Sequence, residues 1–264
     1  MNLAGKSVLL TGATGGLGQA IARRLHAAGC SLVLTGRRVD VLEPLAAEIG
    51  ARALAVDLAE ADAVAGLAQE CAGVDVLVAN AALPASGNVL SFSVEELDAA
   101  LAVNLRAPMV LARLIGERMA ARGSGQLVFV SSLSGKVSTP GSAVYSATKF
   151  GLRGFAQGLR EDLRPHGVGV STILPGFVRD AGMFHDTKVT MPAYVGTTTP
   201  KAVVDAVVSA IERDRSEVEV APIPLRLGIK LAGIAPETAA RVQRRLGAQR
   251  LADAMAAGQA DKRR

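Results

Sequence analysis

The sequence has few of the residues that mark disulfide-rich or metal-binding proteins. Its 264 residues include two cysteines, Cys30 and Cys71, three histidines and no tryptophan. The cysteines have neither CxxC spacing nor ligand-like neighbours, so we expect buried free thiols and no disulfide framework or zinc site. No partner cluster accompanies His26, His166 or His185, and no metal is expected. We interpret His185 as a residue of the surface or of a pocket rim.

Targeting and membrane-spanning segments are also missing from the sequence pattern. The N-terminus, MNLAGKSVLL, has no charged leader, long apolar stretch or small-residue cleavage site. No uncharged run later in the chain is long enough to span a bilayer. We therefore expect a soluble, cytoplasmic protein without a transmembrane segment.

An excess of basic charge is missing over most of the chain, despite a formal net charge of +5. Residues 222–264 carry nine Lys or Arg residues against three acidic ones, which leaves residues 1–221 at a net charge of −1. That body has no global basic field of the kind that non-specific DNA binding needs, so no nucleic-acid partner is expected.

The chain is rich in short runs of Val, Leu and Ile that alternate with alanine-rich stretches of helical length, and half of its residues are hydrophobic. This alternation predicts strands buried on both faces of a parallel sheet. The predicted strands are Ser7–Thr11, Ser31–Thr35, Ala53–Val56, Val74–Ala79, Gln126–Ser131, Val168–Leu174 and Glu217–Val220. The predicted helices lie near residues 16–28, 39–49, 60–71, 94–121, 143–164 and 200–213. The pattern indicates an α/β fold with a single Rossmann-like, doubly wound domain and a seven-stranded parallel sheet.

The first predicted strand ends in a glycine-rich turn, Thr11-Gly12-Ala13-Thr14-Gly15-Gly16-Leu17-Gly18, and a helix starts inside it. Glycines there permit a tight turn and let backbone N–H groups approach a pyrophosphate at the positive end of a helix. An ordinary glycine-rich connector is the alternative. The position between the first strand and the first helix favours a dinucleotide site.

The end of the second strand distinguishes between dinucleotides, because the residue there faces the adenosine ribose in doubly wound sheets. An acidic residue would hold the free 2′-hydroxyl of NAD, but this chain has Gly36-Arg37-Arg38. Arg37 can offer a bidentate guanidinium to a 2′-phosphate, so the sequence favours NADP(H), with NAD(H) possible. Both arginines could instead be solvated surface charges. Asp57, after the third strand, could accept a hydrogen bond from adenine or could cap the helix at 60–71.

Tyr145 and Lys149 lie four residues apart on a predicted helix and therefore project from the same face. An ammonium beside a phenol favours the phenolate, so we expect Lys149 to lower the pKa of Tyr145 from its usual value of about 10. Such a pair suits acid/base chemistry at neutral pH.

The pair belongs to a set of motifs that occur in one order at compatible spacings over about residues 5–220. Together these motifs resemble the short-chain dehydrogenase/reductase family. The set comprises Gly12-x-x-x-Gly16-x-Gly18, Asp57, Asn80-Ala81-Ala82, Asn104, Ser131-Ser132, Tyr145-x-x-x-Lys149 and Pro175-Gly176.

The resemblance implies a catalytic tetrad of Asn104, Ser132, Tyr145 and Lys149. Ser132 would hydrogen-bond the substrate oxygen and Tyr145 would protonate it during reduction, as hydride arrives from the nicotinamide. Lys149 would polarise Tyr145 and bind the nicotinamide ribose, and Asn104 would hold a backbone bend and a water that returns the proton. Ser131 is expected to close its strand, because Ser132 has the family's spacing of thirteen residues to Tyr145.

The resemblance also implies a set of cofactor contacts that includes a loop closing over the nicotinamide, where the backbone of Val178 would contact the carboxamide. The expected set is Gly12, Thr14, Gly15, Gly16, Leu17, Gly18, Arg37, Asp57, Leu58, Asn80, Ala81, Tyr145, Lys149, Pro175, Gly176 and Val178. Two residues depart from the family pattern, since Asp180 replaces a threonine and Ala82 a glycine. Asp180 could accept a hydrogen bond from the carboxamide or repel the cofactor phosphates.

The expected substrate pocket is mostly apolar, which favours a hydrophobic ketone, aldehyde or secondary alcohol. Its expected lining is Leu83, Leu133, Val137, Pro140, Phe177, Met183 and Phe184, with direct substrate contacts from Ser132, Leu133, Tyr145, Phe177 and Met183. Residues 181–197 have little periodicity and are predicted to form a substrate lid.

Residues 1–221 are expected to form the catalytic domain, and residues 222–264 a basic, helical extension. Residues 225–235 place Arg226 and Lys230 on one narrow helical face, with large apolar side chains over the remainder. Three interpretations compete: packing over the chain's own lid, packing on a partner subunit, or lying on an anionic membrane surface. We favour the first two.

The sequence therefore predicts an NADPH-dependent oxidoreductase that reduces a carbonyl on a small apolar substrate, or oxidises the corresponding alcohol. An NAD-dependent alcohol dehydrogenase and a non-catalytic, nucleotide-sensing protein are the alternatives. The resemblance further implies a homodimer or homotetramer, assembled through the helices at 94–121 and 143–164.

Overall fold

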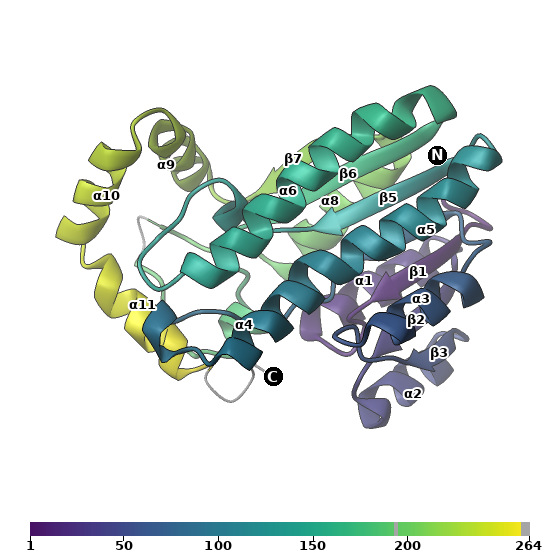
Figure 1. Cartoon of the computed structure of the whole chain (residues 1–264), viewed down its shortest axis with the longest axis horizontal. Helices are drawn as coiled ribbons and strands as arrows, with labels where there is room; N and C mark the ends of the chain where they lie inside the picture. Colours follow the sequence, from purple (N-terminus) through teal and green to yellow (C-terminus); the bar gives the residue numbers. More distant parts are fainter. Residues whose placement is uncertain (193–194, 260–264) are drawn as a thin grey trace.

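The computed structural model describes residues 1–192 and 195–259 and contains one sheet of seven parallel strands in the order β3-β2-β1-β4-β5-β6-β7 (Figure 1). The strands are β1 Ser7–Thr11, β2 Ser31–Gly36, β3 Arg52–Ala55, β4 Val76–Ala79, β5 Gly125–Val130, β6 Val168–Pro175 and β7 Glu217–Val220. The predicted fold class and all seven predicted strands are thus confirmed, with strand ends displaced by at most two residues.

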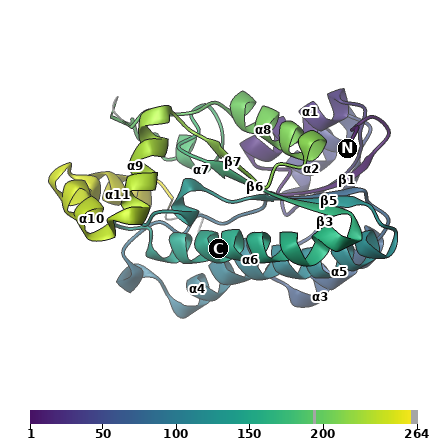
Figure 2. The ribbon, with the colours of Figure 1, turned by 90° about the horizontal axis from the view of Figure 1, so that it is seen from above.

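Alternate residues of each strand enter different cores on the two faces of the sheet. Val8 and Leu10 of β1 pack in one core with α1 (Gly16–Ala27), α2 (Val39–Glu48) and α8 (Pro200–Arg213). Leu9 packs in the other core with α3 (Ala61–Glu70), α5 (Ala107–Ala121) and α6 (Ala143–Leu163). Because side chains alternate along a strand and both faces are covered, continuous apolar runs such as those of β1 and β5 are buried throughout. Figure 2 shows the two helical layers on either side of the sheet.

Apart from one short helix inside the predicted lid, the helices of the body match the predicted ranges closely. They are α1 Gly16–Ala27, α2 Val39–Glu48, α3 Ala61–Glu70, α4 Val94–Leu101, α5 Ala107–Ala121, α6 Ala143–Leu163, α7 Gly182–His185 and α8 Pro200–Arg213. Local signals set their starts: Ser93 and Glu96 form a capping box on α4, and the Thr199 hydroxyl caps α8. On α1, residues Ile21, Ala22 and Leu25 form the stripe that faces the sheet.

The predicted helix over 94–121 contains a π-helical turn, η2 Ala102–Arg106, between α4 and α5. Asn104 lies within this turn and is fully buried. By length and composition alone, the joined helix Val94–Ala121 could cross a membrane, which the sequence interpretation had not anticipated. Half of its apolar window is buried inside the fold, and α5 packs against α3 and β5, as expected of a core helix.

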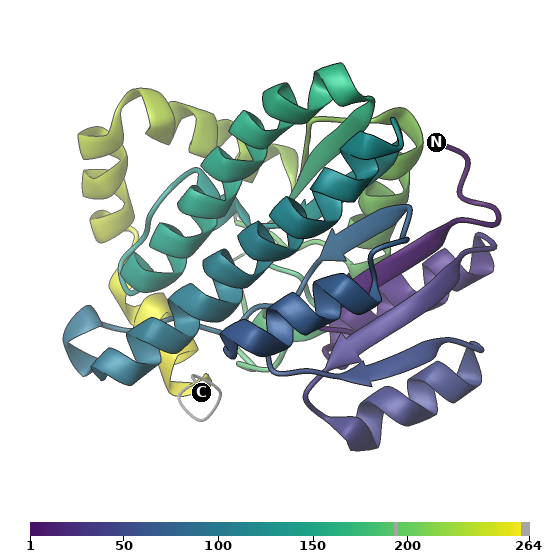
Figure 3. The same ribbon diagram turned by 45° about the vertical axis from the view of Figure 1, so that its right-hand side comes forward.

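Beyond β7 the chain forms three further helices, α9 Ile223–Ile234, α10 Pro236–Arg245 and α11 Ala248–Ala257. They form an arch beyond the carboxyl ends of β5 and β6 (Figures 1 and 3). We call α9, α10 and α11 together the C-terminal arch. In doubly wound sheets, ligands bind at the carboxyl ends of the strands. The arch therefore lies beside the part of the sheet where a ligand is expected.

Candidate active site

In the turn after β1, the backbone of Gly12 lies close to the backbone of Ala81. Gly12 has φ +68°, and a Cβ placed on it would lie 2.7 Å from Cα of Ala81, so no other residue fits. The Thr11 hydroxyl accepts hydrogen bonds from the backbone N–H groups of Asn80 and Ala81, both at 3.1 Å. The Asn80 amide in turn donates to the carbonyls of Thr11 (3.1 Å) and Gly12 (3.2 Å). These hydrogen bonds join the carboxyl ends of β1 and β4 at the base of the cleft.

The start of α1 fits a pyrophosphate. Its N-cap, Gly15, has no side chain to cap the helix, and the first turn contains no acidic residue that would repel an anion. Gly18 lies so close to the preceding turn that a Cβ there would be 2.1 Å from the Gly12 carbonyl oxygen. Thr14, Gly15, Gly16 and Leu17 all line the same cleft, as predicted for cofactor contacts.

Two arginines line the cleft at the end of β2, although only Arg37 was included among the expected contacts. Arg37 forms an ion pair with Asp57, 3.6 Å from Nη1 to Oδ2, and Arg38 donates to the backbone carbonyl of Thr14. Gly36 is required by the close approach of the turn after β1. A Cβ there would lie 2.7 Å from the Thr14 side chain, so the missing side chain admits the phosphate turn.

Asp57 does not cap α3, because the N-cap of that helix is Glu60. Its Oδ1 accepts a hydrogen bond from the backbone of Ala59 at 3.0 Å, and its other oxygen faces Arg37. Asp57 and Leu58 both line the cleft beside the end of β2. The structure therefore excludes the capping alternative and places Asp57 in the cleft beside the end of β2, while its contact with adenine stays a prediction.

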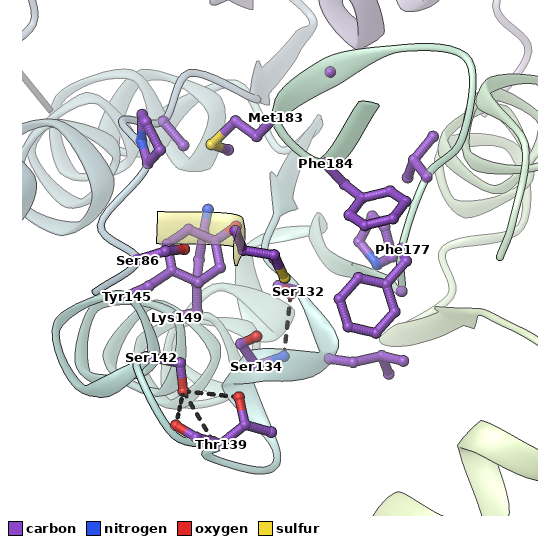
Figure 4. A pocket seen from close by; sticks show the side chains of 18 of the residues that line it. Ser86, Ser132, Ser134, Thr139, Ser142, Tyr145, Lys149, Phe177, Met183 and Phe184 are labelled. Atoms are coloured by element: carbon purple, nitrogen blue, oxygen red, sulfur yellow. Dashed lines mark hydrogen bonds between the residues drawn. The ribbon is translucent and has the colours of Figure 1, made fainter. Parts of the chain in front are cut away.

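Ser132, Tyr145 and Lys149 meet at the carboxyl end of β5 (Figure 4). The Ser132 hydroxyl oxygen accepts a hydrogen bond from the N–H of Ser134 at 3.1 Å, which fixes its orientation. Lys149 Nζ lies 5.5 Å from the centroid of the Tyr145 ring and donates to the Val130 carbonyl at 3.1 Å. All three line the cleft, on β5's end and one face of α6.

Neighbouring Ser131 has the structural role expected of it. Its buried hydroxyl donates to the backbone carbonyl of Lys149 at 3.1 Å, which joins the end of β5 to α6. This bond helps to set the position of the lysine relative to Ser132.

Burial controls the ionisation of the tyrosine and the lysine. Burial raises the pKa of Tyr145 to about 12, against a smaller lowering by its hydrogen bond with Ser132. Burial lowers the pKa of Lys149 to about 8. The expected lowering of the Tyr145 pKa by Lys149 is wrong for this structure, because desolvation of the phenol outweighs the other effects. At neutral pH the phenol therefore retains its proton.

Asn104 lies behind the cleft, where it holds the backbone after β4. Its Oδ1 accepts from the N–H of Leu83 at 2.6 Å, and its Nδ2 donates to the carbonyl of Leu83 at 2.9 Å. The π-helical turn directs this amide toward the segment that includes Leu83, which lines the cleft. Asn104 is therefore a positioning residue in this structure, and the cleft-lining residues do not include it.

The loop after β6 places Pro175, Gly176 and Val178 along the cleft, and Val178 forms a β-bridge with Thr198. Asp180 does not line this cleft. It adopts a left-handed φ of +71°, its side chain is 65% exposed, and it pairs with Arg179 at 3.4 Å. The structure therefore shows no position from which Asp180 would contact the carboxamide, and the expected repulsion of the phosphates stays a prediction.

Ala82, the other departure from the family pattern, needs no special backbone. It lines the cleft, and its φ lies outside the left-handed region that favours glycine. A side chain is therefore tolerated at this position.

The substrate side of the cleft is apolar. Figure 4 shows Phe177 and Phe184 side by side, with ring centroids 5.2 Å apart, across from Tyr145 and Ser132. The other residues expected there also line the cleft: Leu83, Leu133, Val137, Pro140 and Met183. In the described part of the predicted lid, the short helix α7 is followed by irregular chain.

The sequence interpretation missed two groups of cleft residues. One is polar and includes Ser86, Ser134, Thr139 and Ser142, near the entrance to α6. The other is the inner face of the C-terminal arch, from Pro224 to Gln259. The apolar residues at 225–235 indicated that this segment packs against another apolar surface. Which surface it contacts could not be predicted, because that depends on the path of the chain after β7.

The described residues contain no group of three or more His, Cys, Asp or Glu side chains arranged to hold a metal ion. Cys30 and Cys71 are buried free thiols, as predicted. His185 is exposed and does not line the main cleft, and its Nδ1 lies 3.6 Å from Oδ1 of Asp186.

This fold and site define a short-chain dehydrogenase, and residues 6–191 match the family model of that name. The chain belongs to the short-chain dehydrogenase/reductase family. It is 36% identical over 259 residues to the ketoacyl reductase HetN of Nostoc sp., covering 93% of this chain and 90% of the relative.

Two solved structures with a bound cofactor are similar. A short-chain dehydrogenase from Sphingobium yanoikuyae in complex with NADPH has a TM-score of 0.75 and 27% identity, covering 81% of this chain and 87% of that chain. A metagenomic short-chain oxidoreductase in complex with NADP has a TM-score of 0.70 and 33% identity, covering 84% of this chain and 99% of that chain. The protein is an oxidoreductase that acts on keto or hydroxyl groups with NAD(P).

Proposed function

We propose that this protein uses NADPH to reduce the carbonyl of an apolar ketone or aldehyde, with Tyr145 as the proton donor. The observation that carries the proposal is the meeting of Ser132 and Tyr145 between the dinucleotide turn and an apolar wall that includes Phe177 and Phe184. NADPH, when bound, supplies the hydride that reduces the carbonyl carbon.

Each polar group has one task at the carbonyl oxygen. The Ser132 oxygen already accepts from the Ser134 N–H, so its own proton is available to the substrate oxygen. Tyr145 donates the second hydrogen bond and then its proton, because its raised pKa keeps the phenol protonated at neutral pH. A protonated phenol suits reduction better than oxidation, in which the same residue would act as the base.

Lys149 stabilises the phenolate that remains after proton transfer. Its Nζ lies near the Tyr145 ring and is fixed by the Val130 carbonyl. With a pKa of about 8, the amine is mostly protonated at pH 7, and it carries the positive charge that a new phenolate needs. The same ammonium is placed to donate to a ribose hydroxyl, as the family resemblance implies.

NADPH is preferred over NADH in this proposal because Arg37 and Arg38 line the cleft after β2 and no acidic residue lies at the strand end. The NADPH and NADP complexes of the two similar structures support this choice, and the ketoacyl reductase name of the Nostoc relative supports a ketone substrate.

The direct test is a panel of ketones, aldehydes and alcohols with NADPH and with NADH. We expect NADPH-dependent reduction of apolar ketones, and a kcat/KM for NADPH at least tenfold above that for NADH. Arg37→Ala should erase most of this preference, whereas Arg23→Ala, an exposed arginine on the outer part of α1, should not change it. Equal use of NADH by the wild type would favour the NAD-dependent alternative, and no turnover across the panel would favour a nucleotide-sensing protein.

We also propose a homo-oligomer assembled through α4–α5 and α6. The apolar side chains of Leu101 and Phe150 on these helices are 44% and 42% exposed, so a second copy of the chain would cover them in the assembly that the family resemblance implies. Sedimentation velocity should give a dimer or tetramer, and Phe150→Asp should shift it toward the monomer. A wild-type monomer at micromolar concentration would contradict this assembly.

A further inference from the structure

We propose that the C-terminal arch and the loop after β6 enclose a chamber for a long, unbranched apolar chain attached to the substrate carbonyl. This inference rests on the proposed reductase function and specifies its substrate class. The chamber is the part of the cleft between Tyr145 and the inner faces of α9, α10 and α11.

The cleft is larger than one ligand requires. Its volume is about 1610 Å³, whereas a pocket for a single small molecule occupies roughly 300–1,000 Å³. It runs from the glycine-rich turn past Ser132 and Tyr145 to α11. A dinucleotide on the turn would therefore leave a substantial volume beyond the reactive centre.

Each helix of the arch presents apolar residues to this volume. They recur at helical spacing and line the cleft: Leu225, Ile229 and Ala232 on α9, Ala239, Val242 and Leu246 on α10, and Leu251 and Met255 on α11. The arginines Arg241, Arg244 and Arg245 of α10 are exposed and do not line the cleft. The inner face of the arch is thus mostly apolar, with Thr238, Gln243, Arg250 and Gln259 as its polar lining residues, whereas the outer face of α10 is basic.

Several of the apolar side chains that line the cleft are exposed to solvent. Leu231, Ile234, Val242 and Leu246 are 67%, 82%, 49% and 57% exposed. Exposed apolar surface inside a hollow favours an apolar occupant. Because these side chains follow one another along the curved roof, a flexible alkyl chain covers more of them than a compact ring system would.

The arch is held at both ends, which keeps the chamber open. At its start, Arg226 Nε of α9 donates to the half-buried Glu219 of β7 at 3.0 Å. At its end, Ala252 packs on Gly141, and Gln259 donates to the Met183 carbonyl at 3.1 Å. Between these anchors, the main packing partners of α10 are α9 and α11, so α10 bridges the hollow.

Two glycines of α9 supply a matched pair of test positions. Both glycines are exposed, but Gly228 lines the chamber and Gly233 does not. A Cβ at either position meets no atom within 4 Å, and neither glycine has a positive φ, so both accept a side chain without strain. Both replacements should also favour the helix slightly.

The test is the kcat/KM for linear methyl ketones from 2-pentanone to 2-tridecanone with NADPH. Each buried methylene contributes about 0.8 kcal/mol, so kcat/KM should rise up to about fourfold per methylene along the series. Gly228→Phe should fill the chamber and reduce kcat/KM for 2-tridecanone at least tenfold, with little effect on 2-pentanone. Gly233→Phe should behave as the wild type.

A series without chain-length dependence, or a preference for rigid polycyclic ketones over linear ones, would overturn the chamber while leaving the reductase function intact. Equal losses for short and long ketones in Gly228→Phe would do the same.

If no ketone is turned over, that result counts against the proposed reductase function and not against the chamber. A binding measurement then tests the chamber independently of turnover. The linear polyene cis-parinaric acid should fluoresce on binding, with an affinity at least tenfold weaker in Gly228→Phe and unchanged in Gly233→Phe. No binding to the wild type would refute the chamber. Binding that disappears as protein concentration rises would assign the hollow to a second copy of the chain and would also refute it.

Discussion

Replacing buried Lys149 by methionine should stabilise the protein below pH 8 while abolishing turnover. Burial lowers the pKa of this lysine from 10.5 to about 8, and each pKa unit corresponds to about 1.36 kcal/mol. Holding the charged lysine in the fold therefore costs about 3 kcal/mol. Methionine forgoes the hydrogen bond to the Val130 carbonyl, worth about 1 kcal/mol, so the net gain should be about 2 kcal/mol at pH 7.

The gain should depend on pH in a defined direction. The unfolded chain binds more protons at this position between pH 8 and about 10.5, so the stability of the wild type rises with pH over that range. The penalty is complete below pH 8 and disappears above about pH 10. The variant should therefore be more stable at pH 7 and slightly less stable near pH 10.

Urea unfolding of the two proteins at several pH values between 6.5 and 10 measures the difference. Lys201→Met, at a lysine that is 84% exposed, serves as the control and should show no comparable pH-dependent gain. A difference between Lys149→Met and the wild type that does not change with pH, or a less stable variant at pH 7, would refute the reasoning.

The other predictions concern three positioning features. Asn104→Ala leaves both backbone groups of buried Leu83 without their partner, so it should cost about 2 kcal/mol of stability and lower kcat more than NADPH affinity; an unchanged Tm would contradict this. Gly12→Ala should weaken NADPH binding at least tenfold, as measured by titration, because its Cβ would meet backbone at 2.7 Å. Gly5→Ala shares the positive φ without the clash and should bind NADPH normally; equal losses in both variants would show that the close approach is unimportant. Burial raises the pKa of Glu219, but hydrogen bonds from Lys and Arg side chains bring it below its usual value, so this carboxylate stabilises the fold above about pH 4.5 and loses that effect as pH falls. Glu219→Gln should accordingly be less stable than the wild type at pH 7, with a gap in urea midpoints that narrows toward pH 4; a constant gap would refute the assignment.

Local sequence signals were sufficient for the sheet, because buried parallel strands are continuous apolar runs and the glycine turn after β1 has a recognisable composition. The spacing of Tyr145 and Lys149 likewise placed them on one helical face. The positions of these residues in the cleft followed from the order of elements along the chain.

Features that depend on packing could not be predicted from the sequence. The raised pKa of Tyr145 reflects how many atoms surround the phenol, which no i to i+4 spacing reveals. The solvent-facing position of Asp180 follows from a left-handed backbone at a non-glycine residue. The π-helical turn around Asn104 lies inside a sequence with ordinary helical periodicity. The arch depended on long-range anchors such as that between Gln259 and Met183.

The central claim, that Tyr145 gives its proton to the substrate carbonyl, is tested most directly by Tyr145→Phe, with NADPH affinity and turnover measured on the same preparation. Loss of a general acid lowers rates by about 10²–10⁴-fold, so turnover should fall within or beyond that range while the Kd for NADPH changes by less than a few fold. A variant that binds NADPH normally and still reduces ketones at a rate near that of the wild type would contradict the account.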